Sequence, residues 1–329
     1  MPVRIWWIAL LLLTSCQSGP PVYKESRFMM GTIVTFTVID ADKAQAAAAV
    51  RAAADAMQGL ADALTIYGDH ANTVKAFNDS IPGTPMRLGS DAETVLEASM
   101  RVSGQSHDAF DPALGALDVL WGFSLQPPPS TPPSPQTIDR DMANVHCLTR
   151  TAGGWVRHSA VCQLDFGGIA KGYVVDQGIR ILQQHGIHNA IINAGGNLRV
   201  IGSHGKRAWH IGIKHPRQAG GILGAIDLKD GESISTSGDY EHFFMYDGKR
   251  YHHILNPATG WPSRGVQSAT IVAPSGIMSD AWSTALFVLG PAGLPLVARL
   301  GMDGLIVDAD GHLHMTPGMR GRFQPSSPR

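Results

Sequence analysis

The chain has 329 residues, of which 44% are hydrophobic and 16% are charged, with a net charge of −1 at pH 7. A chain of this length and hydrophobic content can bury one large core or two. The near-neutral charge excludes the basic excess that a nucleic-acid-binding surface requires. We therefore expect a globular protein that does not bind nucleic acid.

The N-terminus has the pattern of a secretory signal peptide. A positive residue precedes the apolar run 5–13, which is too short to span a bilayer as a mature helix. The sequence Leu-Thr-Ser-Cys at 13–16 resembles the bacterial lipobox, in which the cysteine is lipidated and becomes the mature N-terminus. We expect a signal peptide over 1–15, lipidation at Cys16 and a tether over 16–27. The choice between the inner and the outer membrane stays open.

Hydrophobic periodicity and turn residues predict the elements of the mature chain in order. We expect helices over 41–64, from a capping box at 90–93 to 104, from 169 to 185, over 279–289 and over 291–300. We expect strands over 28–39, 161–166, 188–201, 208–214, 222–228, 233–237, 242–246, 251–255 and 267–273, and a hairpin over 305–315. Strands that cluster without strict alternation with helices indicate an α+β fold of mixed, largely antiparallel sheets packed with helices.

The same pattern predicts a single domain over 28–316 and a flexible tail over 317–329. The stretch 126–135 holds six prolines, so we expect a stiff surface loop inserted into that domain. Beyond Cys16 the only cysteines are Cys147 and Cys162. In an exported protein they can form a disulfide or remain two buried thiols, and the sequence leaves both alternatives open.

The most informative stretch is 165–176, which reads Asp-Phe-Gly-Gly-Ile-Ala-Lys-Gly-Tyr-Val-Val-Asp. A predicted strand stops at a glycine pair, and a predicted helix with one lysine follows. Glycines at such a turn let the backbone approach a ligand, and the free N–H groups of a new helix favour an anion. The combination suits a phosphate with its metal ion, whereas a glycine pair alone is more often a tight structural turn.

Two further motifs carry groups that can do chemistry. Asp280 and Thr284 are four residues apart, so on a helix they share one face and offer hard oxygen ligands for Mg²⁺. The alternative is that they only cap the helix. His252 and His253 lie at the end of a predicted strand, where one of them can act as a general base at neutral pH. Adjacent strand residues point to opposite faces, so at most one of the two lines a given site.

Asn-Ala-Gly-Gly-Asn at 193–197, Ser-Thr-Ser-Gly-Asp-Tyr at 235–240 and Met-Gly-Thr at 30–32 are weaker candidates for ligand-binding turns. The P-loop, the dinucleotide-binding glycine motif and the serine-hydrolase elbow are all absent from the sequence.

Taken in order, these motifs resemble those of the ApbE family, the FAD:protein FMN transferases. The resemblance extends from the Met-Gly-Thr motif to Asp280 and Thr284, and its most specific parts are 165–172 and 253–260. It implies an ApbE-like, T-fold-like catalytic domain of a lipid-anchored enzyme on the periplasmic side of a bacterial membrane. The implied reaction is Mg²⁺-dependent transfer of FMN from FAD to a threonine or serine hydroxyl of a partner protein, with release of AMP. The implied partners are flavin-carrying subunits of Rnf- or Nqr-type membrane redox complexes.

The resemblance also implies roles for individual residues. His253 and Asp280 are the implied catalytic residues. The implied FAD-binding residues are Met30, Ala109, Phe110, Asp111, Asp165, Lys171 and Leu255. The implied metal ligands are Gly168 through its carbonyl, Asp280, Ser283 and Thr284.

Three positions depart from the family pattern. Ser283 stands where some members have a second Asp, and Asn256 stands where Asp is frequent. His242 stands where Arg often follows the Tyr-Glu pair.

Two other functions stay open from the sequence: a Mg²⁺-dependent FAD pyrophosphatase that gives FMN and AMP, and a non-catalytic FAD-binding lipoprotein. A purely structural envelope lipoprotein would leave the glycine motifs unexplained.

Overall fold

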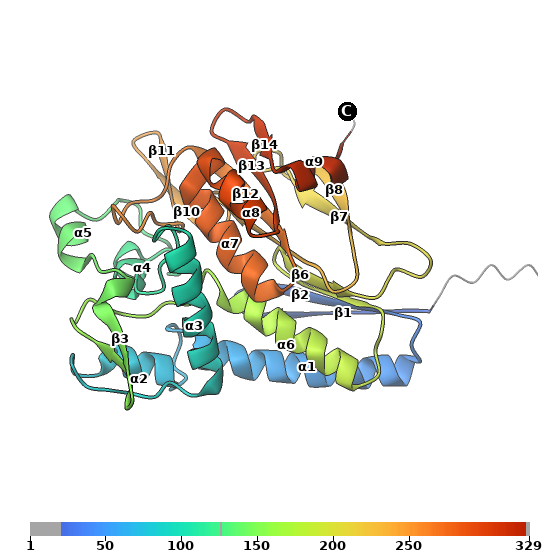
Figure 1. Cartoon of the computed structure of the whole chain (residues 1–329), viewed down its shortest axis with the longest axis horizontal. Coiled ribbons are helices and arrows are strands. Elements are labelled where there is room, and N and C mark those ends of the chain that lie inside the picture. Colours follow the sequence, from blue (N-terminus) through green and yellow to red (C-terminus); the bar gives the residue numbers. More distant parts are fainter. Residues whose placement is uncertain (1–20, 126, 327–329) are drawn as a thin grey trace, which may run out of the picture.

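A computed structural model describes residues 21–125 and 127–326 (Figure 1). Its centre is an eight-stranded sheet in the order β1-β2-β5-β6-β9-β12-β13-β14, and each neighbouring pair is antiparallel. The strands are β1 (Val22–Met29), β2 (Thr32–Ile39), β5 (Ala190–Ala194), β6 (Asn197–Ile201), β9 (Ser233–Gly238), β12 (Val266–Ala273), β13 (Asp303–Asp308) and β14 (Leu313–Met315). The predicted α+β fold with largely antiparallel sheets is confirmed.

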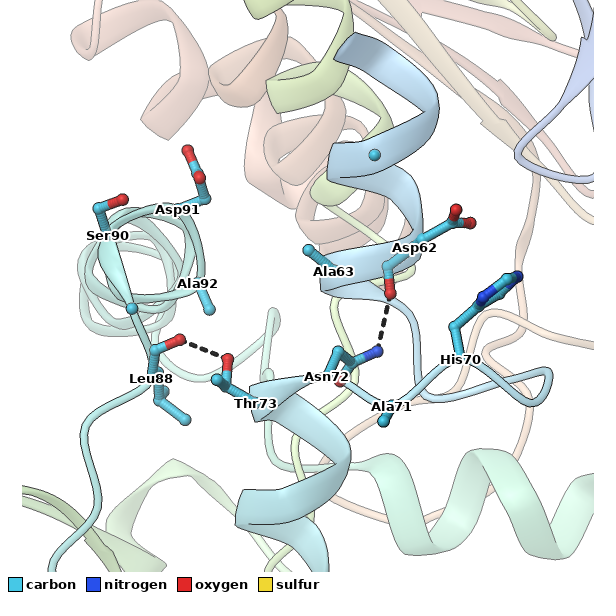
Figure 2. A pocket seen from close by; sticks show the side chains of 12 residues that line it. Asp62, Ala63, His70, Ala71, Asn72, Thr73, Leu88, Ser90, Asp91 and Ala92 are labelled. Carbon is cyan, nitrogen blue, oxygen red and sulfur yellow. Dashed lines mark hydrogen bonds between the residues drawn. The ribbon is translucent and has the colours of Figure 1, made fainter. Parts of the chain in front are cut away.

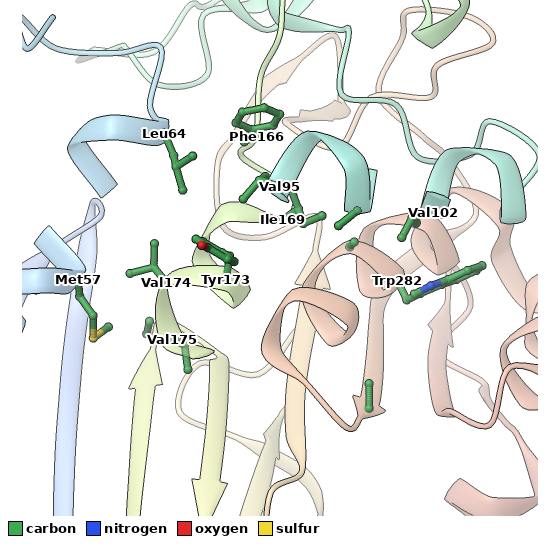
Figure 3. Close-up of a cluster of buried hydrophobic side chains, with 14 of the residues drawn as sticks. Met57, Leu64, Val95, Val102, Phe166, Ile169, Tyr173, Val174, Val175 and Trp282 are labelled. Carbon is green, nitrogen blue, oxygen red and sulfur yellow. The ribbon is translucent and has the colours of Figure 1, made fainter. Parts of the chain in front are cut away.

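Helices cover one face of this sheet and enclose the principal core. They are α1 (Lys43–Leu64), α3 (Ser90–Gln105), α6 (Ala170–Gln184) and α7 (Gly276–Leu289). In Figure 3, α6 lies between Met57 and Leu64 of α1 on one side and Trp282 of α7 on the other. The segment Gly276–Arg299 is apolar and long enough to span a membrane, yet α7 buries most of its side chains against α6, β9 and β12. The apolar side chains of α7 therefore form part of the protein core.

A second, smaller layer covers part of the opposite face of the sheet. It consists of β7 (Trp209–Lys214), β8 (Ile222–Leu228), β15 (Gln324–Pro325) and α9 (Pro317–Arg322). Arg322 binds Glu232 at 2.5 Å and Asp303 at 3.1 Å, which ties α9 to the sheet. The predicted flexible tail over 317–329 is therefore wrong for 317–325, because α9 packs on β13 and β14 and Gln324–Pro325 pair with β8.

The predicted boundary between tether and domain is also wrong. Residues 22–27 belong to β1, which pairs with β2 along its whole length, so the predicted single strand over 28–39 is a hairpin. Residues 22–27 alternate between exposed and half-buried, and few of them are apolar, so hydrophobicity alone does not predict this part of the strand. Cys16 and the signal peptide lie outside the described residues.

The remaining elements form the periphery. They are α2 (Thr73–Asp79), α4 (Gly115–Trp121), α5 (Pro135–Asp141), η1 (Val145–Cys147), β3 (Leu148–Thr151), β4 (Gly154–Arg157), β10 (Phe243–Tyr246), β11 (Lys249–His252), η2 (Gly290–Gly293) and α8 (Leu294–Arg299). Residues 127–134 of the proline-rich stretch form neither helix nor strand, as predicted. Cys147 and Cys162 form a disulfide, which decides between the two alternatives that the sequence left open.

Two local predictions need correction. The N-cap of α3 is Gly89, with a φ of 84° and no side-chain cap, so Ser90 is the first helical residue and the predicted capping box is wrong. The predicted strand over 161–166 is a coil with one bridge between Gln163 and Leu114. Its apolar residues are buried because the coil crosses the main core, which gives the same hydrophobic pattern as a buried strand.

Candidate active site

The site is built around the crossing of α6 and α7, where two glycines allow the backbones to touch. A Cβ atom on Gly172 would lie 2.1 Å from the carbonyl oxygen of Gly276, and one on Gly276 would lie 2.4 Å from that of Gly172. No side chain fits at such distances. The glycine after the lysine in the 165–176 motif is therefore required by helix packing.

Asp280 projects from α7 toward this crossing. Its Oδ2 accepts a hydrogen bond from the Gly172 amide at 2.8 Å, which joins the carboxylate to the first turn of α6. Burial raises the pKa of Asp280, and the positive charge of Lys171 opposes that shift. α7 begins at Gly276, so Asp280 lies beyond the first turn and the helix-cap interpretation of Asp280 does not hold.

The N-cap residue Ser275 makes no side-chain cap, and the first amides of α7 are instead bound by Asp176, the last residue of the motif. Its carboxylate accepts from the amides of Gly276 at 2.7 Å and Ile277 at 3.0 Å. Arg199 also binds Asp176 at 2.7 Å. Asp176 thus fixes the start of α7 against α6, and Asp280 is left to face the site.

Thr284 lies one helical turn beyond Asp280 and meets the glycine pair. A Cβ atom built on Gly168 would lie 3.3 Å from Thr284 Oγ1 and 3.1 Å from the ring of Phe110. The backbone of Gly168 therefore runs close beside the Thr284 hydroxyl. Ser237 of β9 lies 3.3 Å from the same hydroxyl.

Ser283 is placed differently from the other predicted metal ligands. Its Oγ donates to the Asp280 carbonyl at 2.8 Å and lies 2.8 Å from Ser237 Oγ. The side chain is fully buried between α7 and β9. Its hydroxyl is therefore occupied within the helix and the sheet, and its role as a ligand stays a prediction.

Asp165 and Lys171 frame the turn between the coil and α6. Asp165 Oδ1 accepts from the Gly167 amide at 2.5 Å, and Lys171 Nζ donates to the Gly167 carbonyl at 3.2 Å. The loop with Ala109, Phe110 and Asp111 runs alongside, because the Asp165 amide donates to the Pro112 carbonyl at 2.9 Å. The structure thus brings together predicted site residues that are some fifty positions apart in the sequence.

Sequence reasoning missed two residues at this position, Tyr67 and Asp118. The Tyr67 hydroxyl interacts with the Asp165 carboxylate, and Asp118 of α4 interacts with it electrostatically. Burial is the main cause of the raised pKa of both carboxyl groups. Neither residue belongs to a recognisable motif; the only available signal was a tyrosine in the polar loop after the alanine-rich helix.

The structure also distinguishes the two adjacent histidines. His252 donates from Nε2 to the Ser263 carbonyl at 2.8 Å and accepts at Nδ1 from the Ile254 amide at 3.3 Å, so both ring nitrogens are occupied. Nδ1 of His253 is buried and has no hydrogen-bond partner among the described residues. Of the two, His253 is therefore the one with a ring nitrogen that no described residue occupies.

His253 is held at the base of the β10–β11 ribbon. Its amide donates to the His242 carbonyl at 3.1 Å, and the two imidazole rings meet edge to face at 5.3 Å. Burial lowers the pKa of His253 to about 3, and the charges of His242 and Lys171 act in the same direction. The ring is therefore neutral near pH 7, which is the form that accepts a proton.

Lys171 connects the two halves of the site. Its charge lowers the pKa of His242 and His253 and opposes the raised pKa of Asp280. One cation thus acts on both the predicted metal-binding carboxylate and the predicted base. A positive charge in this position favours a phosphate between them.

The last two predicted FAD-binding residues lie at the margins of this arrangement. Leu255 is buried in an aromatic cluster with Trp121 and Tyr251, and it pairs with Pro262. Met30 is at the β1–β2 turn with a φ of 53° and packs against the main core. Contact of either residue with FAD stays a prediction.

Two surface cavities lie outside the predicted site. One of about 490 Å³ lies where α1 ends and α2 and α3 begin, and Figure 2 shows Asp62, His70 and Asp91 around it. Another of about 760 Å³ runs beside Lys249, Tyr251 and Arg264. Neither is lined by a predicted site residue, so we place the site at the α6–α7 crossing.

The predicted magnesium ion fits the donors present at this crossing. Asp280, Thr284 and the Gly168 carbonyl offer a carboxylate, a hydroxyl and a backbone oxygen, which are the hard ligands that Mg²⁺ takes. A side chain at position 168 would crowd the Thr284 hydroxyl and the Phe110 ring, which agrees with a glycine at this position. The donor set contains no thiolate or imidazole that would favour a softer metal.

Comparison with known proteins places this arrangement in one family. A profile of the ApbE family matches residues 30–306, so the chain belongs to the ApbE family. A FAD:protein FMN transferase of Rhodobacter capsulatus is 36% identical over 235 residues, which are 70% of this chain and 45% of that protein. A FAD:protein FMN transferase of Klebsiella pneumoniae is 30% identical over 306 residues, which cover 88% of this chain and 87% of that protein.

Solved structures show the same fold. The ApbE protein of Thermotoga maritima superimposes with a TM-score of 0.85 at 31% identity, over 93% of this chain and all of that one. The flavinyl transferase ApbE of Pseudomonas stutzeri gives 0.82 at 29% identity, over 94% and 98%. The predicted ApbE-like fold is therefore confirmed.

Proposed function

We propose that this protein transfers FMN from FAD to a serine or threonine hydroxyl of a partner protein and releases AMP. The observation that carries the proposal is the buried Nδ1 of His253, which has no hydrogen-bond partner in the described part of the chain, in a site where Lys171 also acts on Asp280. A protein that only bound FAD would need no such base. Family membership and the relatives named FAD:protein FMN transferase support the same reaction.

In the proposed reaction, the acceptor hydroxyl attacks the FMN-side phosphorus of FAD and the bond to AMP breaks. His253 takes the hydroxyl proton at Nδ1, which is unprotonated near pH 7 because burial lowers the pKa of the ring. Lys171 holds the diphosphate by charge. A positioned base of this kind contributes about 10²- to 10⁴-fold to the rate.

Asp280, Thr284 and the Gly168 carbonyl would hold Mg²⁺. When bound, the ion would neutralise the charge that develops on the leaving AMP. Asp280 is oriented for this task by the Gly172 amide, which occupies one carboxylate oxygen and leaves the other for a ligand. Catalysis of phosphoryl-type transfers depends mostly on such positioning and electrostatics.

The test combines the purified protein with FAD, MgCl₂ and a purified flavin-carrying subunit of an Rnf- or Nqr-type complex. We expect flavin fluorescence on the acceptor band after denaturing electrophoresis, and AMP in equal amount. Omission of Mg²⁺ and replacement of the acceptor hydroxyl residue by alanine are the two controls.

The same experiment separates the alternatives. Free FMN and AMP without a labelled acceptor would show a pyrophosphatase, in which water takes the place of the hydroxyl. FAD binding without either product would overturn both enzyme hypotheses and favour a flavin-binding lipoprotein.

We also propose that Cys16 is lipidated and holds the domain at the periplasmic side of the membrane. Five residues, 17–21, separate Cys16 from β1. Fully extended, they span roughly 20 Å, so the tether keeps the domain close to the membrane in which acceptor subunits reside. Replacement of Cys16 by alanine should move the protein from the membrane to the soluble fraction; an unchanged distribution would contradict the proposal.

A further inference from the structure

The hairpin between β13 and β14 gathers two histidines and two aspartates on one exposed surface, away from the α6–α7 crossing. β14 is the last strand in the order of the central sheet. The hairpin sequence is Asp-Ala-Asp-Gly-His-Leu-His over 308–314. His312 and His314 are two residues apart on an extended segment, so their side chains share one face.

Both imidazoles converge on one oxygen of Asp308. Oδ2 of Asp308 lies 2.7 Å from Nε2 of His314 and 3.5 Å from Nδ1 of His312. A carboxylate oxygen of Asp310 lies within 4.8 Å of the ligand atoms of Asp308 and His312. Asp308, Asp310 and His312 therefore bring their ligand atoms within 4.8 Å of one another, and His314 contacts the same Asp308 oxygen from β14.

The backbone fixes this arrangement. Oδ1 of Asp308 accepts the amides of Asp310 at 3.0 Å and His312 at 2.9 Å, which leaves Oδ2 to face the imidazoles. The turn is held from the neighbouring strand as well, because Gln267 donates to the Ala309 carbonyl at 2.9 Å. The Asp308 side chain is 18% exposed and that of His312 is 74% exposed, so an ion can enter from solvent.

We propose that Asp308, Asp310, His312 and His314 bind a divalent transition-metal ion such as Zn²⁺. Ligand atoms about 2.1 Å from a tetrahedral zinc ion are about 3.4 Å from one another. The separation of 3.5 Å between Asp308 and His312 already matches this value, and that of 2.7 Å between Asp308 and His314 needs to open by less than one ångström. Imidazole nitrogens select zinc, nickel, cobalt or copper over Mg²⁺ and Ca²⁺.

The two proposed metal sites therefore differ in the atoms that they offer as ligands. The α6–α7 crossing offers oxygen atoms alone, whereas the hairpin offers two nitrogens and two carboxylates. An ion on the hairpin would join β14 to the end of β13 and stabilise the edge of the sheet. Binding to the folded state alone raises the melting temperature.

The test is a calorimetric titration of the mature full chain with ZnCl₂ in the presence of excess MgCl₂. We expect His312→Ala/His314→Ala to bind one Zn²⁺ fewer than the wild type, and His314→Ala to bind that ion about ten-fold or more weakly. The matched control is His210→Ala, which removes the single histidine of an exposed pair with Asp227 at 2.8 Å. We expect the control to keep the full number of ions.

A second measurement guards against a folding defect. Without zinc, the melting temperatures of the double variant and the wild type should agree, because both histidines are on the surface. With zinc, the wild type should gain thermal stability that the double variant lacks. Equal zinc stoichiometry and equal affinity in the wild type and the double variant would overturn the proposal.

Discussion

The α6–α7 crossing and the base of the β10–β11 ribbon meet at one site but are built on different principles. At the crossing, Gly172 and Gly276 bring two backbones into contact and leave no room for a Cβ atom. At the base of the ribbon, the decisive feature is which nitrogen atoms of His252 and His253 have partners. The first region depends on the absence of side chains, and the second on their hydrogen bonds.

This difference separates positioning from chemistry. The crossing fixes where Asp280 and Thr284 lie, because the distance between α6 and α7 has almost no freedom. The ribbon uses one histidine to hold the chain and leaves its neighbour available. Substitutions should therefore act on stability or on turnover according to the region and the residue.

The largest expected effect comes from the carboxylate at the crossing. Asp280→Asn keeps an oxygen for the Gly172 amide but removes the negative charge, so FMN transfer should fall about 10³-fold. Thermal melting should change little, because the hydrogen bond to α6 is retained. The readout is the rate of acceptor labelling at saturating Mg²⁺. Normal labelling by Asp280→Asn would show that the carboxylate charge is not needed.

A glycine at the crossing should have the next largest effect. Gly172→Ala places a Cβ atom against the Gly276 carbonyl, so the free energy of unfolding should fall by about 3 kcal/mol or more, as measured by urea denaturation. Gly104→Ala is the matched control, since no atom of the described residues outside its own stretch of α3 lies within 4 Å of its Cβ position. The control should be neutral or more stable by up to about 1 kcal/mol. Equal losses in both variants would refute the close-contact explanation.

The adjacent histidines should separate the two kinds of effect. His253→Ala should lower the rate of transfer by about 10²-fold or more and leave the fold intact, because no described residue hydrogen-bonds to its Nδ1. His252→Ala should instead lower the free energy of unfolding by about 1–3 kcal/mol, since the Ser263 carbonyl loses its donor. Single-turnover experiments on both variants measure the rate of transfer, and urea denaturation measures the free energy of unfolding. A reversal of the two results would contradict the assignment.

The smallest expected effect is in the dependence of stability on pH. Burial lowers the pKa of His252 to about 4 and that of His253 to about 3, whereas in the unfolded chain histidine titrates near 6.5. Below that value the unfolded state binds more protons, so stability falls as pH falls, by about 1.5 kcal/mol per histidine between pH 6.5 and 5.

His252→Gln should weaken this dependence by one histidine, as urea melts at pH 7 and pH 5 will show. The raised pKa of Asp280 acts in the opposite direction in both proteins and cancels in the comparison. An unchanged pH dependence in His252→Gln would mean that the His252 ring has the same pKa in the folded and the unfolded state.

Much of the site was predictable because its motifs are local. The glycine pair with Lys171, the spacing of Asp280 and Thr284, and the two histidines each lie within one turn or one strand end. Spacing on a helix or strand determines which side chains share a face, whatever the rest of the chain does. The sequence therefore determined the class of fold, the family resemblance and the principal candidate residues.

Only the tertiary structure decided which of these residues meet and which have partners. The roles of Tyr67 and Asp118 depend on contacts with Asp165 from distant parts of the chain. The ordered C-terminal segment depends likewise on pairing with β8, and the Cys147–Cys162 disulfide on the approach of two peripheral segments. Pairing, burial and hydrogen-bond partners across such separations follow from packing of the whole chain, and no local pattern contains them.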